Sequence, residues 1–435
     1  MPKWLNWLLL AILAIISVQI IALFKMPSNA SQLPSDAGDK EQLTLHFMSN
    51  WGEGDPRAKT LQQILDEYAE QNSLTIINES MYGDDFFDNL KINFASSDDP
   101  DIFTASPNDD IASLIQAGKI ISLDSFLKND PKWLDGFKSG VLDYDMYEDK
   151  IYGVPLELVY QCLFINTDLF NEYNIPIPTT YDDLKLAILM FRREQVIPIA
   201  YNSLSEGAYL YENLITRLGS KSEIENNPKN IFPPDAYLDG IVYLKELYQL
   251  GAFPWEAFML DDQGKDDLFI NKKAAMLVQG SWFISQLPRD DSTVSLAAFP
   301  YFSDKREYAD GIVLDVGNGN FYMSAKAFSN PGKRQAAIGL LKKLTSPETA
   351  LKFANETGMF TAIKLDGYKL DQSRLAQEGA ALVANAKYTV RPVHSVLEKR
   401  TWNDGVVKKL PYILDDMDSP PKDAARALWY SIWEQ

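Results

Sequence analysis

The chain has 435 residues, of which 46% are hydrophobic and 23% are charged, and its formal net charge at pH 7 is −19. This length exceeds one ordinary core and the composition is that of a folded protein, so we expect two lobes or domains. The acidic excess disfavours nucleic acids and anionic membrane surfaces as partners, because both would repel the protein.

The N-terminal segment is typical of export. Residues 1–24 carry one early positive charge, Lys3, followed by a long apolar run. Small residues at Ser28 and Ala30 suit cleavage after Ala30, but the run also has the roughly 20 residues that a membrane helix needs. We therefore expect residues 1–30 to be a signal peptide or an N-terminal anchor, residues 31–42 to be a linker, and the protein to be periplasmic or otherwise extracytoplasmic.

Cysteine and histidine are scarce. Cys162, the single cysteine, lies in an apolar run and is expected to be a buried, inert thiol. His46 and His394 are the only histidines of the sequence, too few for a histidine-rich metal site. We expect no metal and no cofactor.

Strand and helix patterns alternate from residue 43 onward. Strands are predicted at 43–47, 74–78 and 101–104, with helices at 57–68 and 84–94 between them. This order predicts parallel βαβ units in an open α/β sheet.

Ligands of open α/β sheets bind beyond the carboxyl ends of the strands, so the loops there hold candidate contacts. Trp51 and Glu53 follow the first strand, and Asp109 follows the third. The alternatives are a packed tryptophan for Trp51 and a helix cap for Asp109, at the start of a helix over 111–117.

A similar junction is predicted at residues 272–287. A buried strand at 274–278 is followed by Gly280, and Ser281 is expected to cap a helix that carries Trp282. The flat indole of Trp282 can stack on the C–H face of a pyranose, and the alternative is a ring packed under a loop.

Further candidates lie where strands end or where the chain changes lobe. Glu157 interrupts an apolar stretch, so its carboxylate is either paired or turned toward a cleft. The other candidates combine stacking faces, amide groups and flexible backbone: Tyr201, Asn202, Trp255, Gly317 and Asn318.

Five segments, in the same order along the chain, resemble those of the extracellular solute-binding proteins of family 1, the capture subunits of carbohydrate-importing ABC transporters. They are Pro100–Phe103, Asp149–Pro155, Phe164–Phe170, Phe269–Trp282 and Leu344–Glu348. Two positions depart from the family pattern, because Lys272 replaces a usual glycine and Thr361 replaces a usual proline. The second departure puts in doubt a ligand role for the loop at Gly358–Phe360.

The resemblance implies a type II periplasmic-binding-protein fold, with two open-sheet α/β lobes joined by a hinge of three crossings. The implied lobes are 43–155 plus 316–358 and 156–315 plus 359–435. The implied function is capture of a sugar or short oligosaccharide by a monomer that delivers it, chemically unchanged, to an ABC permease.

Two alternatives stay open. The same fold can report its ligand to a chemoreceptor or a sensor kinase. A secreted carbohydrate-active enzyme such as a glycoside hydrolase is the other, because acidic residues are plentiful. The sequence offers no nucleophile motif, phosphate-binding glycine loop or metal-ligand spacing for an enzyme.

Overall fold

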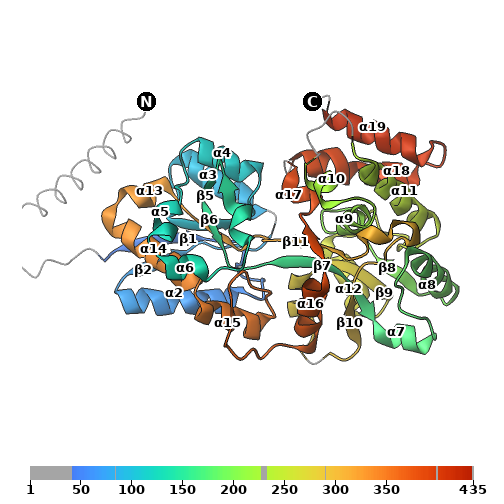
Figure 1. Ribbon diagram of the computed structural model, residues 1–435, viewed down its shortest axis with the longest axis horizontal. Helices are drawn as coiled ribbons and strands as arrows, with labels where there is room; N and C mark the ends of the chain where they lie inside the picture. The colour runs from blue at the N-terminus through green and yellow to red at the C-terminus, as the bar shows by residue number, and fades with distance from the viewer. Residues whose placement is uncertain (1–41, 84, 227–232, 290, 398–399, 434–435) are drawn as a thin grey trace, which may run out of the picture. The chain divides into compact units, whose positions relative to one another are not determined.

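The computed structural model describes residues 42–83, 85–226, 233–289, 291–397 and 400–433 (Figure 1). The expected export segment, and the linker up to residue 41, lie outside these ranges. Among the described helices, none combines the length and the apolar character required to cross a lipid bilayer.

The first sheet is built from both the beginning and the later part of the chain. Its strands lie in the order β2 (Thr75–Asn78), β1 (Thr44–Met48), β3 (Ile102–Ala105), β12 (Asn320–Met323) and β6 (Gly153–Pro155). β1 is parallel to β2 and β3, as the βαβ pattern predicts, whereas β12 is antiparallel to β3 and β6. β12 thus completes a sheet that begins almost 280 residues earlier in sequence.

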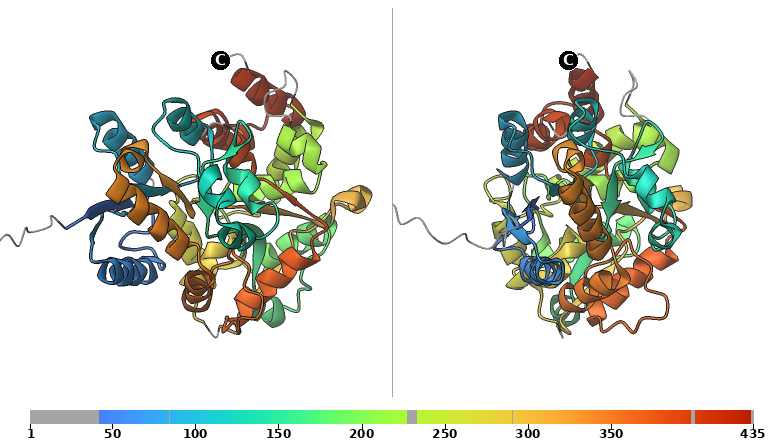
Figure 2. Two further views of the ribbon diagram at one scale, coloured as in Figure 1. Left: turned by 60° about the vertical axis from the view of Figure 1, so that its left-hand side comes forward. Right: turned by 90° about the vertical axis from the view of Figure 1, so that its left-hand side faces the viewer.

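Helices that are far apart in sequence cover this sheet together (Figure 2). The elements that pack with it are α2 (Ala58–Asn72), α3 (Asp85–Ser96), α4 (Asp109–Gln116), α5 (Asp124–Lys128), α6 (Pro131–Asp135), η1 (Val141–Asp145), the hairpin β4 (Met146–Tyr147) and β5 (Lys150–Ile151), α13 (Ala325–Ser329), α14 (Pro331–Leu344) and α15 (Pro347–Thr357). α2 buries Leu61, Leu65 and Tyr68, as its period predicts, and the Tyr68 hydroxyl donates to the Ala336 carbonyl on α14 at 2.8 Å.

The second sheet has the order β13 (Tyr388–Val390), β11 (Gly311–Asp315), β7 (Val159–Asn166), β9 (Ala274–Gly280) and β8 (Ile197–Ala200), and β10 (Val294–Ala297) also pairs with β7. β8 is parallel to β9 and β11 to β13, while β7 is antiparallel to both β9 and β11. Every residue of β9 is buried, as its continuous apolar pattern predicts, and Cys162 on β7 is buried as well.

The elements around the second sheet are α7 (Thr167–Glu172), α8 (Tyr181–Arg193), α9 (Tyr209–Thr216), α10 (Lys221–Asn226), α11 (Asp235–Gln249), α12 (Asp262–Ile270), η2 (Ser281–Gln286), η3 (Ser303–Tyr308), α16 (Arg374–Asn385), α17 (Val393–Val396), η4 (Thr401–Val406), η5 (Val407–Lys409), α18 (Leu410–Asp415) and α19 (Pro421–Trp433). The C-terminal region is mostly helical, but it also supplies the short strand β13.

One detail differs from expectation. Ser281 does not cap a helix: η2 is a 3-10 helix that begins at Ser281, with Gly280 in the capping position and no side-chain cap. The hydroxyl of Ser281 instead accepts a hydrogen bond from the Tyr160 amide at 3.4 Å, which joins η2 to β7. Thr180 caps α8 through a reciprocal capping box with Asp183.

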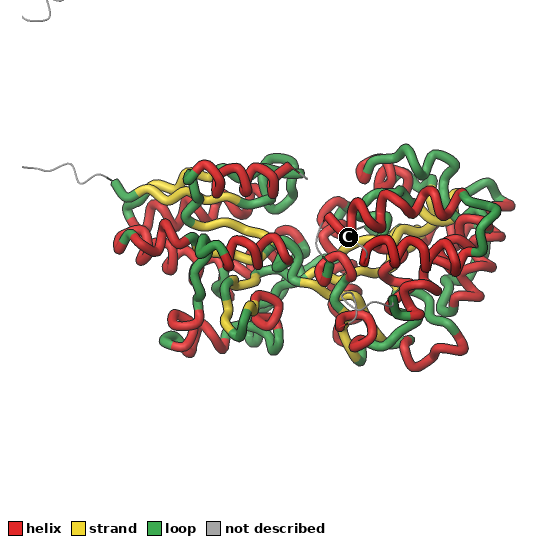
Figure 3. The backbone as a smooth tube through the Cα atoms, turned by 90° about the horizontal axis from the view of Figure 1, so that it is seen from above, coloured by secondary structure: helices red, strands yellow, loops and turns green. Residues whose placement is uncertain are grey.

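The chain passes between the sheets along neighbouring paths. Residues 156–158 lead from β6 to β7, and residues 316–319 lead from β11 back to β12. Beside the first path, the Ala362 amide donates to the Leu156 carbonyl at 2.8 Å and the Leu158 amide donates to the Phe360 carbonyl at 2.6 Å. Seen from above, these segments join the two halves (Figure 3). The architecture is the expected pair of open α/β sheets.

Asp145, in η1, provides a test of how the first half responds to pH. Its carboxylate accepts a hydrogen bond from the Tyr322 hydroxyl at 2.6 Å, and its second oxygen is buried with no partner among the described residues. Burial raises the pKa of Asp145 to about 7. The folded protein therefore keeps a proton that the unfolded chain releases near pH 4.

We predict that the free energy of unfolding falls as pH rises from about 4 to 7, by up to about 4 kcal/mol from this group. Asp145→Asn should remove this part of the pH dependence, whereas Asp143→Asn, at an exposed site on the same helix, should leave it in place. Urea unfolding at pH 5 and pH 8 measures the difference. Equal pH profiles for Asp145→Asn and the unmodified protein would contradict the assignment.

Candidate functional site

The carboxyl ends of strands in the two sheets face each other. β6 ends where the chain leaves the first sheet, and β1, β2 and β3 run in the same direction as β6. β11 ends where the chain leaves the second sheet, and β8, β9 and β13 share its direction. The loops that follow these strands therefore lie on the facing sides of the two halves. We call these two sides the walls, and the region between them the interlobe gap; open α/β sheets bind ligands at this end of their strands.

Trp51 does not line this gap, which corrects its expected ligand contact. The side chain has no exposed surface and packs against Phe321 and Phe353, with ring centroids 6.1 and 5.5 Å away. The guanidinium carbon of Arg57 lies 4.9 Å from the ring centroid. A large apolar ring beside a sheet is stabilised more by burial than by exposure, so Trp51 supports the wall from behind.

Glu53 and Asp109 are both exposed at the carboxyl edge of the first sheet. Glu53 bridges through its backbone to Met81, which fixes the loop against the segment after β2. Asp109 is not the cap of α4: Asn108 takes that role by accepting from the Asp110 and Ile111 amides. The carboxylate of Asp109 is therefore left outside the capping interaction.

Glu157 is a buried and paired carboxylate, which is one of the two outcomes that the sequence predicts for it. Its two oxygens accept hydrogen bonds from one terminal nitrogen of Arg57 at 2.8 and 2.7 Å. The remaining guanidinium nitrogens donate to Asp55 at 2.8 and 2.6 Å. Burial raises the pKa of Glu157 and Arg57 opposes this, while the carboxylates of Glu157 and Asp55 outweigh burial to raise the pKa of Arg57.

The return path requires glycine. Gly317 has a φ of +56°, and a Cβ there would lie 2.8 Å from a Val159 methyl group. A Cβ at Gly319 would lie 2.7 Å from the Cβ of Glu157, so the outgoing and return paths touch. Asn318, between the glycines, is exposed, and its side-chain oxygen accepts a hydrogen bond from the Ser106 hydroxyl.

Tyr201 and Asn202 are buried, which corrects their expected ligand contact. The Tyr201 ring stacks on Phe253 with centroids 4.1 Å apart, and the amide of Asn202 donates to Asp262 at 2.8 Å. Both residues hold the loop after β8 against the α11–α12 connection. The Tyr201 hydroxyl has no hydrogen-bond partner in the part of the chain that the structure describes.

Two tryptophans of the second half retain exposed surface. Trp282 is half-buried on η2, and its indole nitrogen would lie only 2.4 Å from a Cβ at Gly280, so the glycine makes room for the ring. Trp255 is 88% exposed and lies in the connection between α11 and α12. This connection begins beside β8, because the Ala252 carbonyl accepts a hydrogen bond from the Ile199 amide. An exposed ring of this size is unusual unless something covers it.

Sequence reasoning missed a charged network behind the second wall. The ammonium of Lys265 is buried and lies 2.7 Å from Glu206 and 3.3 Å from Asp266. Gln279, on β9, donates to the same Glu206 oxygen at 2.8 Å. Gln279 was the available signal, because a polar residue inside a fully buried strand requires a partner. Burial raises the pKa of Asp266 to about 7 against the opposing effect of Lys265.

Two tyrosines near the gap were also missed. Tyr82 is 55% exposed, and its ring packs beside Gly54, where it would contact any added Cβ. Burial raises the pKa of the Tyr82 phenol, and Glu206 of the second half and Asp55 of the first raise it further. Tyr209 lies on the second wall at the start of α9, with its ring 5.9 Å from that of His394.

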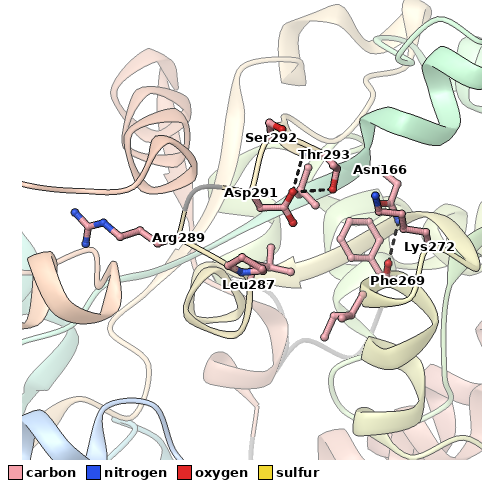
Figure 4. Close-up of a pocket in the computed structure, with 11 residues that line it drawn as sticks. Asn166, Phe269, Lys272, Leu287, Arg289, Asp291, Ser292 and Thr293 are labelled. Atoms are coloured by element: carbon pink, nitrogen blue, oxygen red, sulfur yellow. Dashed lines mark hydrogen bonds between the residues drawn. The ribbon is translucent and has the colours of Figure 1, made fainter.

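A separate hollow of about 610 Å³ lies at the opposite edge of the second sheet (Figure 4). Asn166, at the end of β7, donates to the Phe269 carbonyl at its rim, and Asp291 accepts from the Thr293 hydroxyl. Arg289, which also lines the hollow, donates to the Asn355 carbonyl on α15 at 2.8 Å, so the hollow extends toward a helix of the first half.

Comparison with known proteins assigns the family. The family model described as bacterial extracellular solute-binding protein matches residues 52–351. The chain belongs to this family. It is 24% identical over 402 residues to a multiple sugar-binding protein of Streptococcus mutans, covering 89% of each chain.

Solved structures show that solute-binding proteins share the fold. One comes from work on xylan utilization by Caldanaerobius polysaccharolyticus, with a TM-score of 0.76, 22% identity and coverage of 90% of this chain and 100% of that one. Another is a chitin oligosaccharide binding protein, with a TM-score of 0.76, 18% identity and coverage of 90% and 98%. The two-lobed type II periplasmic-binding fold expected from the sequence is confirmed.

The Arg57 network is expected to stabilise the fold of this solute-binding protein. We predict that Arg57→Met lowers the free energy of unfolding by about 3–5 kcal/mol, because it leaves two buried carboxylates without their cation. Lys343→Met, which removes a more exposed pair with Glu67 at 3.8 Å, should cost about 1 kcal/mol or less. Urea unfolding at pH 7 compares them, and equal costs would show that the buried network is not needed for stability.

Proposed function

We propose that the protein captures a sugar or short oligosaccharide in the interlobe gap and releases it unchanged. One observation carries the proposal: the carboxyl ends of both sheets open onto the same gap, and the exposed groups there suit a glycan. Trp282 offers a half-exposed ring for stacking, and Glu53, Asp109 and Asn318 offer hydroxyl acceptors. The sugar-binding names of several relatives support this ligand class.

We propose the hinge and the lobes as follows. The first lobe is 43–155 plus 316–358, and the second is 156–315 plus 359–435. The bridge from Ile363 to Phe137 favours moving the third crossing a few residues later, toward the start of α16. Gly317 gives the second crossing backbone freedom, and Glu157 ties the first crossing to α2. A ligand that touches both walls favours closure to the extent that it binds the closed form better.

The proposed partner is an ABC permease that recognises the closed form, and the protein acts as an exported monomer held outside the cytoplasm, free or tethered. The family to which the chain belongs is extracellular, which supports this location. An enzymatic role is not proposed. Glu157, Asp55 and Glu206 are engaged by Arg57 or Lys265, and this supports a structural or binding role over proton transfer.

Screening saccharides by thermal shift tests the function. A ligand at about 100 times its Kd adds about 2.7 kcal/mol to the free energy of unfolding, because it binds only the folded protein. We predict that at least one neutral oligosaccharide raises the melting temperature by several degrees. New reducing ends after prolonged incubation would contradict capture without chemistry, and a complete panel without any shift would contradict sugar binding.

Trp282 provides the matching mutational test. Trp282→Ala should abolish the ligand-induced shift without unfolding the protein, because the ring is only half-buried. Tyr412→Ala removes another aromatic ring, 78% exposed on α18, and should leave the shift intact. Circular dichroism checks the fold of both variants. A full ligand response in Trp282→Ala would show that the indole only packs.

A further inference from the structure

Acidic groups outnumber basic groups in the charged networks beside the gap. On the second wall, the ammonium of Lys265 lies 2.7 Å from Glu206, 3.3 Å from Asp266 and 3.9 Å from Asp262. Three carboxylates thus share one ammonium, and only 1% of the Lys265 side chain is exposed. A cation so enclosed has no free face to offer to an anionic ligand.

Glu206 is the most constrained carboxylate of this wall. One of its oxygens accepts hydrogen bonds from Lys265 and from Gln279, at 2.7 and 2.8 Å. The other has no hydrogen-bond partner among the described residues, and 21% of the side chain is exposed. Glu206 is therefore an acceptor that is already oriented before a ligand arrives.

The opposite wall repeats this arrangement. Arg57 is its basic group nearest the first crossing, and Asp55 and Glu157 already occupy its guanidinium. Glu53, in the same loop, is exposed and forms no ion pair in the described ranges. Both walls thus combine a neutralised cation with surplus carboxylate.

Tyr82 connects the charges of the two walls. It follows β2 of the first sheet, yet the carboxylate of Glu206, which follows β8 of the second sheet, contributes to the raised pKa of its phenol. Asp55 acts in the same direction and Arg57 in the opposite one. Tyr82 and Glu206 follow strands whose carboxyl ends face each other, and 21% of the Glu206 side chain is exposed.

We propose that this gap selects uncharged saccharides over those that carry carboxylates, with Glu206 as the specificity-determining residue. The inference rests on the proposed sugar-binding function. A uronate entering the gap beside Glu206 would lose its hydration near carboxylates and would find Lys265 and Arg57 already paired. A neutral sugar instead presents hydroxyl donors to the same acceptors.

Matched ligands test the selection. For every hexose oligomer that raises the melting temperature, calorimetry compares it with the uronate oligomer of the same linkage and length, such as a galactose and a galacturonate chain. For a pentose chain, the comparison is the same chain with a single glucuronate branch. We expect the uronate to bind at least about ten-fold more weakly at low salt, with a smaller difference at about 0.5 M salt, where surface charges are screened.

Two variants test whether Glu206 is responsible for the selection against uronates. Glu206→Gln should reduce the neutral-to-uronate affinity ratio by several fold, because it removes a charge and keeps an acceptor oxygen. Glu307→Gln removes an exposed carboxylate at the other edge of the second sheet and should leave the ratio unchanged. The comparison in the unmodified protein stands even if Glu206→Gln fails to fold.

Each outcome has its own meaning. Equal or tighter uronate binding would overturn the selection and leave sugar capture in place. An unchanged ratio in folded Glu206→Gln would overturn the role of Glu206. A panel in which no saccharide binds would overturn the proposed function, and the selection with it.

Discussion

The buried carboxylate of Glu157 is the constraint on which the arrangement of the two halves depends. A carboxylate in the core is costly unless it is paired and hydrogen-bonded, and here both oxygens are bound by Arg57. Arg57 stands at the start of α2, while Glu157 lies on the first path between the sheets. The ion pair therefore fixes the direction in which the chain leaves the first sheet. Gly319 lets the return path lie against it.

The same principle recurs on the second wall with a different cation. Lys265 is buried among Glu206, Asp262 and Asp266, and Gln279 satisfies a further hydrogen bond from within the sheet. These networks hold the walls in shape before a ligand arrives, so less ordering is required on binding. In a solute-binding protein, this leaves the free energy of ligand contact available for closure.

Many of the individual helices and strands could be predicted from the sequence, because they depend on local patterns, whereas the two-lobed fold was implied by the family resemblance. The period of α2, the apolar run Ala274–Val278 of β9 and the capping box of α8 each follow from neighbouring residues. The candidate site was harder. Trp51 follows a strand at the expected edge but turns inward, and Asn108 caps α4 one residue before the Asp109 that was considered for the role. The partners of Glu206 are 59 and 73 residues away, and spacing alone does not reveal them.

The place of β12 in the first sheet has a consequence for the order of folding. β12 lies between β3 and β6, and β6 forms no ladder with any other described strand. During synthesis, about the first 320 residues must emerge before β12 can pair with β3. Until then, one edge of β3 has no neighbouring strand. Pairings between such distant segments slow folding, because the chain loses the entropy of loop closure before the contacts stabilise it. The first sheet is therefore completed only after most of the chain has been synthesised, and its N-terminal strands are not a folding nucleus by themselves.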